Sequence, residues 1–185
     1  MKIYSFHNQE DQAYLYAPMP VVDACVPDPP CSLAAGWKPP SFDAVGHDEF
    51  CSYLPMTDFP TLIFGTTVLS ARAVRHLWPI IETCGEALPI QLSNHPGEYF
   101  LFNITRVINA VDMRHSKFLA LPSGAIGPCE HLAFDPKLIP IQAILFKTTQ
   151  LGPADTIFAT QLAVDAVKRA RLTGHAFELD WSDEF

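Results

Sequence analysis

Two short stretches of the sequence contain residue types that could do chemistry. Asp112, His115 and Ser116 are the types of a hydrolytic triad, in which an acid orients a histidine that activates a serine. They are close sequence neighbours, and their spacing does not show that they converge on one substrate. Solvated loop residues that cap the local backbone are the simpler interpretation. A nucleophile elbow is also missing, because residues 122–124 read Pro-Ser-Gly and lack the first glycine of Gly-x-Ser-x-Gly.

Metal binding is the second chemical possibility. Seven histidines are scattered along the chain, and the closest cluster is Cys129, Glu130 and His131. Zinc sites usually combine two such pairs, so this cluster alone predicts no metal, and no cofactor motif is present. The five cysteines are odd in number and contain no Cys-x-x-Cys, which predicts free thiols in a reducing compartment. An alternative that stays open is a small hydrolase or metal-dependent enzyme using Asp112, His115, Cys129 or His131.

Acidic residues gather in two places, one within the first third of the chain and one at its end. The formal net charge is −8, which disfavours binding to nucleic acid and favours a basic protein partner. Ordinary solvated faces are the alternative interpretation. The residues that we expect to contact a partner are Asp43, Asp48, Glu49, Asp180, Trp181, Asp183 and Glu184.

Two helices are expected to organise the domain. Ser70 is a candidate N-cap for a helix whose apolar residues recur through Ile81 with helical spacing. Pro79 lies inside this pattern, so we expect a kink or break near residues 76–78, and Gly85 is expected to end the helix. A second helix should begin at Thr160 and end at Gly174. Its expected buried stripe is Leu162, Ala163, Ala166, Val167 and Ala170.

The remaining elements are expected to be strands around an irregular N-terminal arm. Nine prolines between residues 17 and 60 predict a long proline-rich arm without regular structure, packed on the domain through its aromatic residues. Strands are expected at residues 2–6, 13–16, 61–64, 88–93, 99–104, 131–134, 141–147, 156–158 and 175–181. The sequence therefore predicts a single α+β domain over residues 1–185, with a largely antiparallel sheet and two main helices.

The stretch from Pro96 to Phe118 is apolar on both faces of its strand, which is typical of a central, covered strand. Its polar residues, Asn103, Arg106, Asn109 and Asp112, fall at every third position. We therefore expect the strand to end near Ile104 and to be followed by a bulge or a short helical turn. There the polar side chains would bond the arm or the loop after Asp112.

No apolar run approaches the ~20 residues that span a bilayer, and the N-terminus lacks the apolar core of a signal peptide. We expect a cytoplasmic protein without membrane contact.

Several motifs together resemble a known family. They are the run Glu98-Tyr99-Phe100-x-x-Asn103, the run Val107–Asp112 followed by Ser116, and the ending Leu172-Thr173-Gly174-x-x-Phe177. Over residues 61–181 the chain resembles immunity family eleven of bacterial polymorphic toxin systems. The resemblance implies an α+β protein, encoded beside a toxin, that protects the producing cell by binding that toxin.

The resemblance also implies a non-enzymatic protein, because the family has no catalytic residues to carry over. With the acidic charge, it leads us to expect a heterodimer with a basic nuclease effector of a type VI or contact-dependent system. Tyr99, Asn103, Asp112, Ser116 and Gly174 are interpreted as structural residues of the family motif.

Overall fold

The computed structural model describes residues 1–9, 11–47, 52–62, 66–120, 126–151 and 156–184 of the chain. The elements found there are β1 (Lys2–Asn8), β2 (Tyr14–Tyr16), α1 (Met19–Asp23), β3 (Ser41–Val45), β4 (Thr67–Ser70), α2 (Ala71–Ile81), β5 (Gly85–Leu92), β6 (Tyr99–Ile104), β7 (Lys117–Ala120), β8 (Ile126–His131), the 3-10 turn η1 (Pro136–Leu138), β9 (Leu145–Phe146), β10 (Phe158–Thr160), α3 (Gln161–Ala170) and β11 (His175–Ser182).

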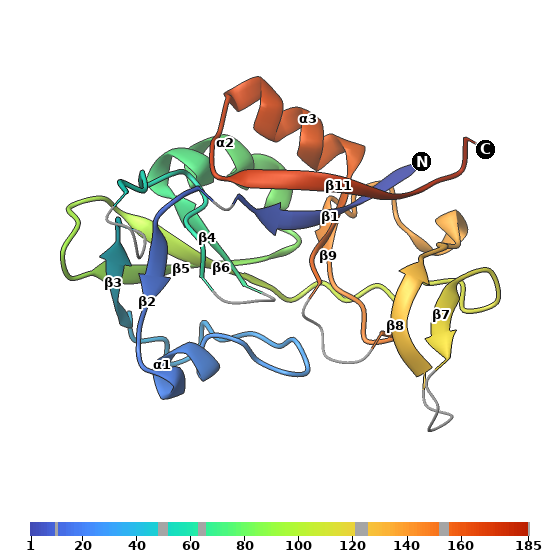
Figure 1. Cartoon of the computed structure of the whole chain (residues 1–185), viewed down its shortest axis with the longest axis horizontal. Helices are drawn as coiled ribbons and strands as arrows, with labels where there is room; N and C mark the ends of the chain where they lie inside the picture. The colour runs from blue at the N-terminus through green and yellow to red at the C-terminus, as the bar shows by residue number, and fades with distance from the viewer. Residues whose placement is uncertain (10, 48–51, 63–65, 121–125, 152–155, 185) are drawn as a thin grey trace.

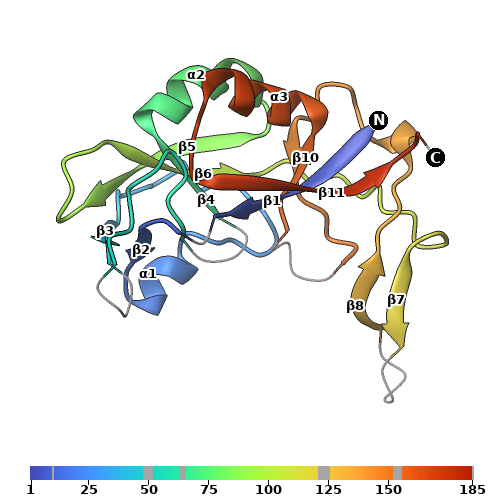
Figure 2. The same cartoon turned by 45° about the horizontal axis from the view of Figure 1, so that its top comes forward.

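The strands form two main sheets and a separate hairpin. One sheet has the order β11-β1-β10-β9, the second has the order β2-β3-β5-β6-β4, and β7 pairs with β8. Every strand pair is antiparallel except β3 with β5. The expected α+β class with largely antiparallel pairing is confirmed. Helices α2 and α3 lie together over one side of the molecule, and β7–β8 projects at the end opposite β3 (Figures 1 and 2).

Strand β6 is a covered strand, as its sequence predicts, and it separates two cores. Tyr99 and Leu101 pack with residues of β2, β3 and α1, whereas Phe102 and Ile104 pack beneath the helices. The strand ends at Ile104, and the amides of Thr105 and Arg106 both donate to Cys84 O at 3.1 Å. Thr105 and Arg106 thus stand together opposite the single residue Cys84, which is the pattern of a β-bulge. The bulge expected after the end of this strand is therefore present.

Helix α2 begins as predicted but does not break at its proline. Ser70 Oγ accepts a hydrogen bond from the Ala73 amide at 3.0 Å, and the helix runs through Pro79 to Ile81. Gly85 is not its C-terminal stop. A side chain at Gly85 would collide with Asn103 O at 2.1 Å, so glycine allows β5 to approach β6 closely.

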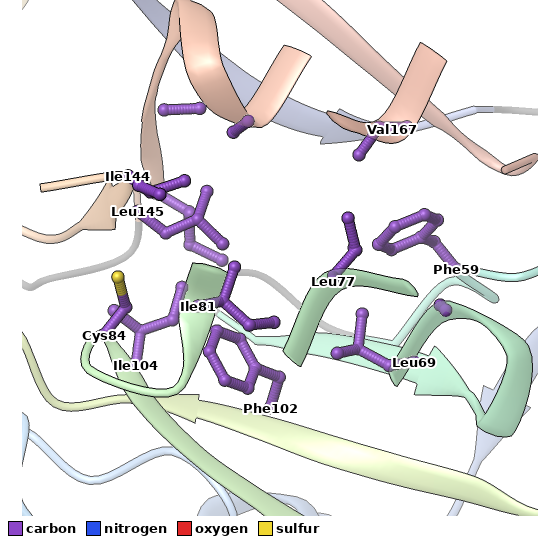
Figure 3. Close-up of a cluster of buried hydrophobic side chains, with 14 of the residues drawn as sticks. Phe59, Leu69, Leu77, Ile81, Cys84, Phe102, Ile104, Ile144, Leu145 and Val167 are labelled. Carbon is purple, nitrogen blue, oxygen red and sulfur yellow. The ribbon is translucent and has the colours of Figure 1, made fainter. Parts of the chain in front are cut away.

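The side chains between α2, α3 and the sheet form the helical core shown in Figure 3. Leu77 of α2 points toward Val167 of α3, and Phe102 of β6 fills the space below. The predicted buried stripe of α3 is corrected in part, because Leu162 is 50% exposed and Val164 is buried instead. Thr160 occupies the N-cap position without a side-chain cap, and the left-handed residue that ends α3 is Arg171 rather than Gly174.

Some loop predictions were wrong. Residues 17–60 contain α1 and β3, and β3 is an inner strand of the five-stranded sheet. The strand expected at residues 131–134 lies earlier, as β8, and the one expected at 141–147 is reduced to β9. Residues 63 and 64 of the strand predicted at 61–64 lie outside the described residues. Packing of the arm on the domain is present, since Val22, Cys25 and Phe42 are buried with Leu88 and Leu101.

Candidate partner-binding surface

The triad types near residue 112 do not form a triad. Asp112 Oδ2 lies 2.6 Å from His115 Nδ1, and this hydrogen bond holds the pKa of Asp112 below its usual value. Ser116 Oγ instead accepts from the Ala133 amide at 2.9 Å and lies 3.3 Å from Ala133 O. The serine therefore fastens two backbone segments together and is not paired with His115.

Cys129 and His131 also lack the surroundings of a reactive site. Cys129 Sγ donates to Lys117 O at 3.4 Å, and burial raises the pKa of its thiol, which disfavours the reactive thiolate. His131 pairs with Lys117 across the β7–β8 hairpin. In the part of the chain that the structure describes, no three His, Cys, Asp or Glu side chains are placed to hold a metal ion.

A serine–histidine pair that sequence reasoning missed lies on β1. Ser5 Oγ is 2.7 Å from His7 Nε2, and Glu178 Oε2 approaches the same nitrogen at 3.7 Å. In a catalytic triad the acid binds the other ring nitrogen, so this order is unsuitable for activating the serine. Ser5 is also buried, which withholds its hydroxyl from a substrate.

The C-terminal acidic residues are largely engaged within the chain. Asp183 binds the N-terminal amine of Met1, and Glu184 lies 2.9 Å from Lys2 Nζ. Trp181 packs edge-on against Phe134, with ring centroids 6.1 Å apart. Asp180 lies 3.4 Å from Ser5 Oγ, and burial raises the pKa of its carboxyl. Four of the predicted contact residues therefore have structural partners of their own.

Asp43 is placed differently from these residues. It is exposed on β3 and accepts a hydrogen bond from Ser93 Oγ, whereas Asp48 and Glu49 lie outside the described residues. Strand β3 and the C-terminus lie at opposite ends of the molecule in both views (Figures 1 and 2). Asp43 and the C-terminal acidic residues therefore do not lie on one surface.

Exposed tyrosines surround Asp43. In the β2–β3 ladder Tyr16 lies opposite Asp43, and Tyr14 lies opposite Val45. Because opposite residues of an antiparallel pair share a face, these four side chains form one outward surface. Tyr14 and Tyr16 are 42% and 59% exposed, while Leu15 between them is buried.

The surface continues beyond the strand. His47 pairs with Tyr53, whose side chain is 74% exposed, and the two rings lie 6.1 Å apart. We call the set Tyr14, Tyr16, Asp43, Val45, His47 and Tyr53 the tyrosine face. Its tyrosines were missed from the sequence, although the alternation Tyr14-Leu15-Tyr16 was a signal for an exposed aromatic row.

The tyrosine face belongs to the acidic part of the chain. Residues 3–71 contain eight Asp and Glu side chains and one Lys, a net charge of −7 out of the total of −8. Tyrosine is enriched at protein interfaces because its ring supplies large contact area and its hydroxyl a hydrogen bond. The face thus combines aromatic anchors with the exposed carboxylate of Asp43.

The residues that we interpret as the family motif make contacts within the chain. Asn103 is 4% exposed and donates to Cys31 O at 2.8 Å and Glu86 Oε2 at 3.1 Å, the contact with the arm that the sequence led us to expect. Tyr99 OH donates to Thr57 O at 3.3 Å. Gly174 has φ +94°, a left-handed conformation in which a Cβ would come within 2.1 Å of Thr57 Oγ1.

The space inside the protein offers no ligand site at the helical core. The cavity there has a volume of about 20 Å³, is lined by side chains such as Phe6, Leu77 and Phe177, and is far below the size of ligand pockets. No helix of the described residues has the length and apolar character needed to cross a membrane.

An α+β fold with an exposed aromatic face, and with its candidate nucleophiles tied into backbone contacts, has the features of a binding protein. The chain belongs to the immunity protein family Imm11, whose family model matches residues 38–179. The match includes β3 and extends through most of β11. Among curated proteins, no match was found.

Proposed function

We propose that this protein is a non-enzymatic immunity protein that binds and neutralises a cognate bacterial toxin in the cytoplasm of the producing cell. The observation that carries the proposal is the family match, which covers residues 38–179. The contacts of Ser116, Cys129 and Ser5 also support a role in binding, because each of these groups is occupied structurally.

The partner is a basic toxin, and a nuclease delivered by a type VI or contact-dependent system fits this chemistry. Nucleases carry positive charge around their substrate cleft, and opposite charge on an inhibitor accelerates encounter and favours the correct partner. The net charge of −7 in residues 3–71 supports this choice of partner.

The tyrosine face is the proposed contact surface for the toxin. Tyr14, Tyr16 and Tyr53 would provide aromatic anchors, and Asp43 would pair with a cation of the toxin. A stable inhibitor complex buries roughly 1,600 Å² in total, so residues around the face would also contribute. In this arrangement the immunity protein covers the toxin's substrate cleft and forms a heterodimer with it.

Co-expression with the toxin encoded beside this protein tests the function. The two proteins should co-purify, and growth should be restored in cells that produce the toxin. Absence of both effects would reject the proposal that the chain neutralises that toxin.

Two charge reversals then locate the surface. Asp43→Lys combined with Tyr16→Ala should weaken toxin binding at least about 30-fold, the size expected when a hot spot is removed. Glu184→Lys is the matched control at the opposite end of the molecule, and it should leave the affinity within about threefold. If Glu184→Lys weakens binding and the β2–β3 variant does not, the toxin is bound at the C-terminal end.

A further inference from the structure

A groove lies between the two main helices, on a different side of the molecule from the tyrosine face. It has a volume of about 430 Å³. Its aliphatic lining comes from Ile80 of α2, Leu162 and Ala166 of α3, and Ile144 of the segment before β9. His76 and Arg169 lie at its polar rim. Helices α2 and α3 run side by side at the top of Figure 2.

The groove exposes apolar surface that folding has not covered. Leu162 is 50% exposed and lies outside the buried face of the amphipathic helix α3, which consists of Ala163, Val164 and Val167. Ile80 and Ala166 beside it are only partly buried. In helix-in-groove recognition, the apolar residues of a bound helix pack against exposed aliphatic side chains of this kind.

The charge of this region is opposite to that of the whole protein. The two helices with their C-caps, residues 71–82 and 161–171, contain five Arg or Lys side chains and two acidic ones. Arg72 is paired with Asp58. Arg75, Lys168, Arg169 and Arg171 are exposed, and among the described residues none of them has an acidic side chain within ion-pair distance. In a chain of net charge −8, these unpaired cations on the two helices are a local exception, and one of them, Arg169, lines the groove.

We propose that the α2–α3 groove binds an acidic amphipathic helix of a partner protein. Apolar residues of that helix at positions i, i+4 and i+7 would enter the groove beside Leu162, and its carboxylates would face Arg169. The lining residues of α3 run from Leu162 to Ala170, about 12 Å along the helix, so the groove accommodates about two turns of a bound helix.

A protein helix fits this site better than a nucleic acid or a membrane. Nucleic acid binding depends on a broad positive field, which a chain of net charge −8 does not provide. A vesicle surface would bring negative lipids close to the same net negative charge. A helix presents apolar and acidic side chains on one narrow element and need approach only the groove. This site is independent of the proposed toxin contact, because the tyrosine face stays free when the groove is filled.

The test uses the full-length protein labelled with ¹⁵N and a synthetic helical peptide of about three turns, with leucines on one face and glutamates beside them. Its matched control is the same peptide with lysine in place of every glutamate. The glutamate peptide should cause saturable amide shifts within residues 71–82 and 161–171, with an affinity at least about tenfold above that of the lysine peptide. Equal affinity for both peptides, or shifts located elsewhere, would overturn the proposal.

Variants distinguish the groove from nonspecific attraction. Arg169→Glu and Leu162→Ala should each weaken the peptide complex about tenfold, whereas Arg114→Glu, at an exposed cation away from the helices, should not. Leu162 and Arg169 are exposed, and circular dichroism of the variants checks that they fold.

Stronger binding to anionic vesicles than to the glutamate peptide would assign the groove to a membrane. A groove that is covered when the protein dimerises at NMR concentration would assign it to a second copy. Either result rejects the partner helix.

Discussion

Asp58 Oδ2 lies 2.6 Å from Arg72 Nη1, and this ion pair joins both main helices to the N-terminal part of the chain. The same carboxylate accepts from Ser70 Oγ at 2.7 Å and from the Thr173 amide at 3.1 Å. Arg72 Nη2 in turn donates to Ala170 O at 2.8 Å, at the C-terminal end of α3. A guanidinium there is also favourable for the helix dipole.

Removing the Asp58 carboxylate should therefore lower stability strongly. Asp58 is 7% exposed, so Asp58→Ala leaves the half-buried Ser70 hydroxyl and the Thr173 amide without their acceptor and Arg72 without its counter-charge. We expect a loss of about 3 kcal/mol in the free energy of unfolding, measured by urea denaturation at neutral pH. Asp23→Ala, at an exposed position on α1, is the control and should change stability by less than about 0.5 kcal/mol. Equal effects of the two substitutions would show that the carboxylate does not join these segments.

Alanine substitutions at two glycines with positive φ distinguish the cost of backbone strain from the cost of a steric collision of the added Cβ atom. Gly174 has φ +94° and no room for a Cβ, whereas Gly36 has φ +84° and nothing within 4 Å of the Cβ position. Gly36→Ala should cost about 1 kcal/mol, which is the penalty for the left-handed backbone alone. Gly174→Ala should cost at least about 3 kcal/mol, because Thr57 and Gln12 must also move. Thermal unfolding of both variants measures the difference, and similar melting temperatures would contradict it.

The N-terminal residues of the two helices should respond in opposite ways to loss of a hydroxyl. Ser70→Ala removes the cap of α2 and a hydrogen bond to Asp58, so it should cost about 1–2 kcal/mol. Thr160 Oγ1 is buried, and no described group is its hydrogen-bond partner. Thr160→Val should therefore be neutral or slightly stabilising, because it removes an unsatisfied polar atom at constant shape. Chemical denaturation of the two variants gives the comparison, and a destabilising Thr160→Val would point to a partner for the hydroxyl.

His175 should make the protein less stable in mild acid. Its ring is stacked on Phe6 and contacts Phe59 and Phe177, and this burial lowers the pKa of His175 from 6.5 to about 4, against the opposing attraction of Asp58. Between these values the unfolded chain binds a proton that the folded protein does not. The contribution to stability is therefore complete above about pH 6.5 and is lost as the pH falls toward 4, by on the order of 2 kcal/mol after allowance for solvent screening.

Unfolding titrations of the wild type and His175→Phe across this pH range test the effect. The variant should lose less stability than the wild type over the range, since all other titrating groups are common to both. If the free energy of unfolding changes equally with pH in the wild type and the variant, the acid sensitivity comes from other residues.

Asn103 should matter for stability and not for toxin binding by the folded protein. Burial acts to raise the pKa of Glu86, but hydrogen bonds from Ser32, the Leu33 amide and Asn103 outweigh it and keep that pKa low. Asn103→Ala removes one of these bonds and the contact with Cys31 O, so it should cost about 1–2 kcal/mol. Calorimetry measures the stability, and titration with the toxin measures the affinity of the folded fraction. Unchanged melting with lost affinity would instead place Asn103 in the interface.

Local patterns predicted the elements whose signals lie within one segment. Ser70 with the apolar period to Ile81 indicated α2, and the alternation of the β6 residues indicated a strand covered on both faces. The inner strand β3 was missed because prolines surround it and its ladder partners lie far away in the sequence. The β7–β8 hairpin was missed because glycine and proline interrupt its second strand.

The functional surface was less accessible to sequence reasoning than the fold. Charge counts indicated an acidic partner-binding protein, but they could not show that Asp183 and Glu184 bind the first two residues of the chain. Nor could they show that Asp58 accepts from Thr173, 115 residues away. Such ion pairs and hydrogen bonds join segments that are distant in the sequence. The periodicity and the composition of a sequence do not show which distant segments come into contact.

The pairing of β1 has a consequence for the timing of protection. Its ladder partners are β10 and β11, so β1 cannot complete its pairing until Ser182 has been synthesised. At translation rates of roughly 5–20 residues per second, this wait lasts on the order of 10–35 s. Folding of the four-stranded sheet is thus completed only after β11 has been made, so a newly made molecule would neutralise its proposed toxin only after this delay. A cell that meets a sudden dose of toxin must depend on immunity protein that it folded beforehand.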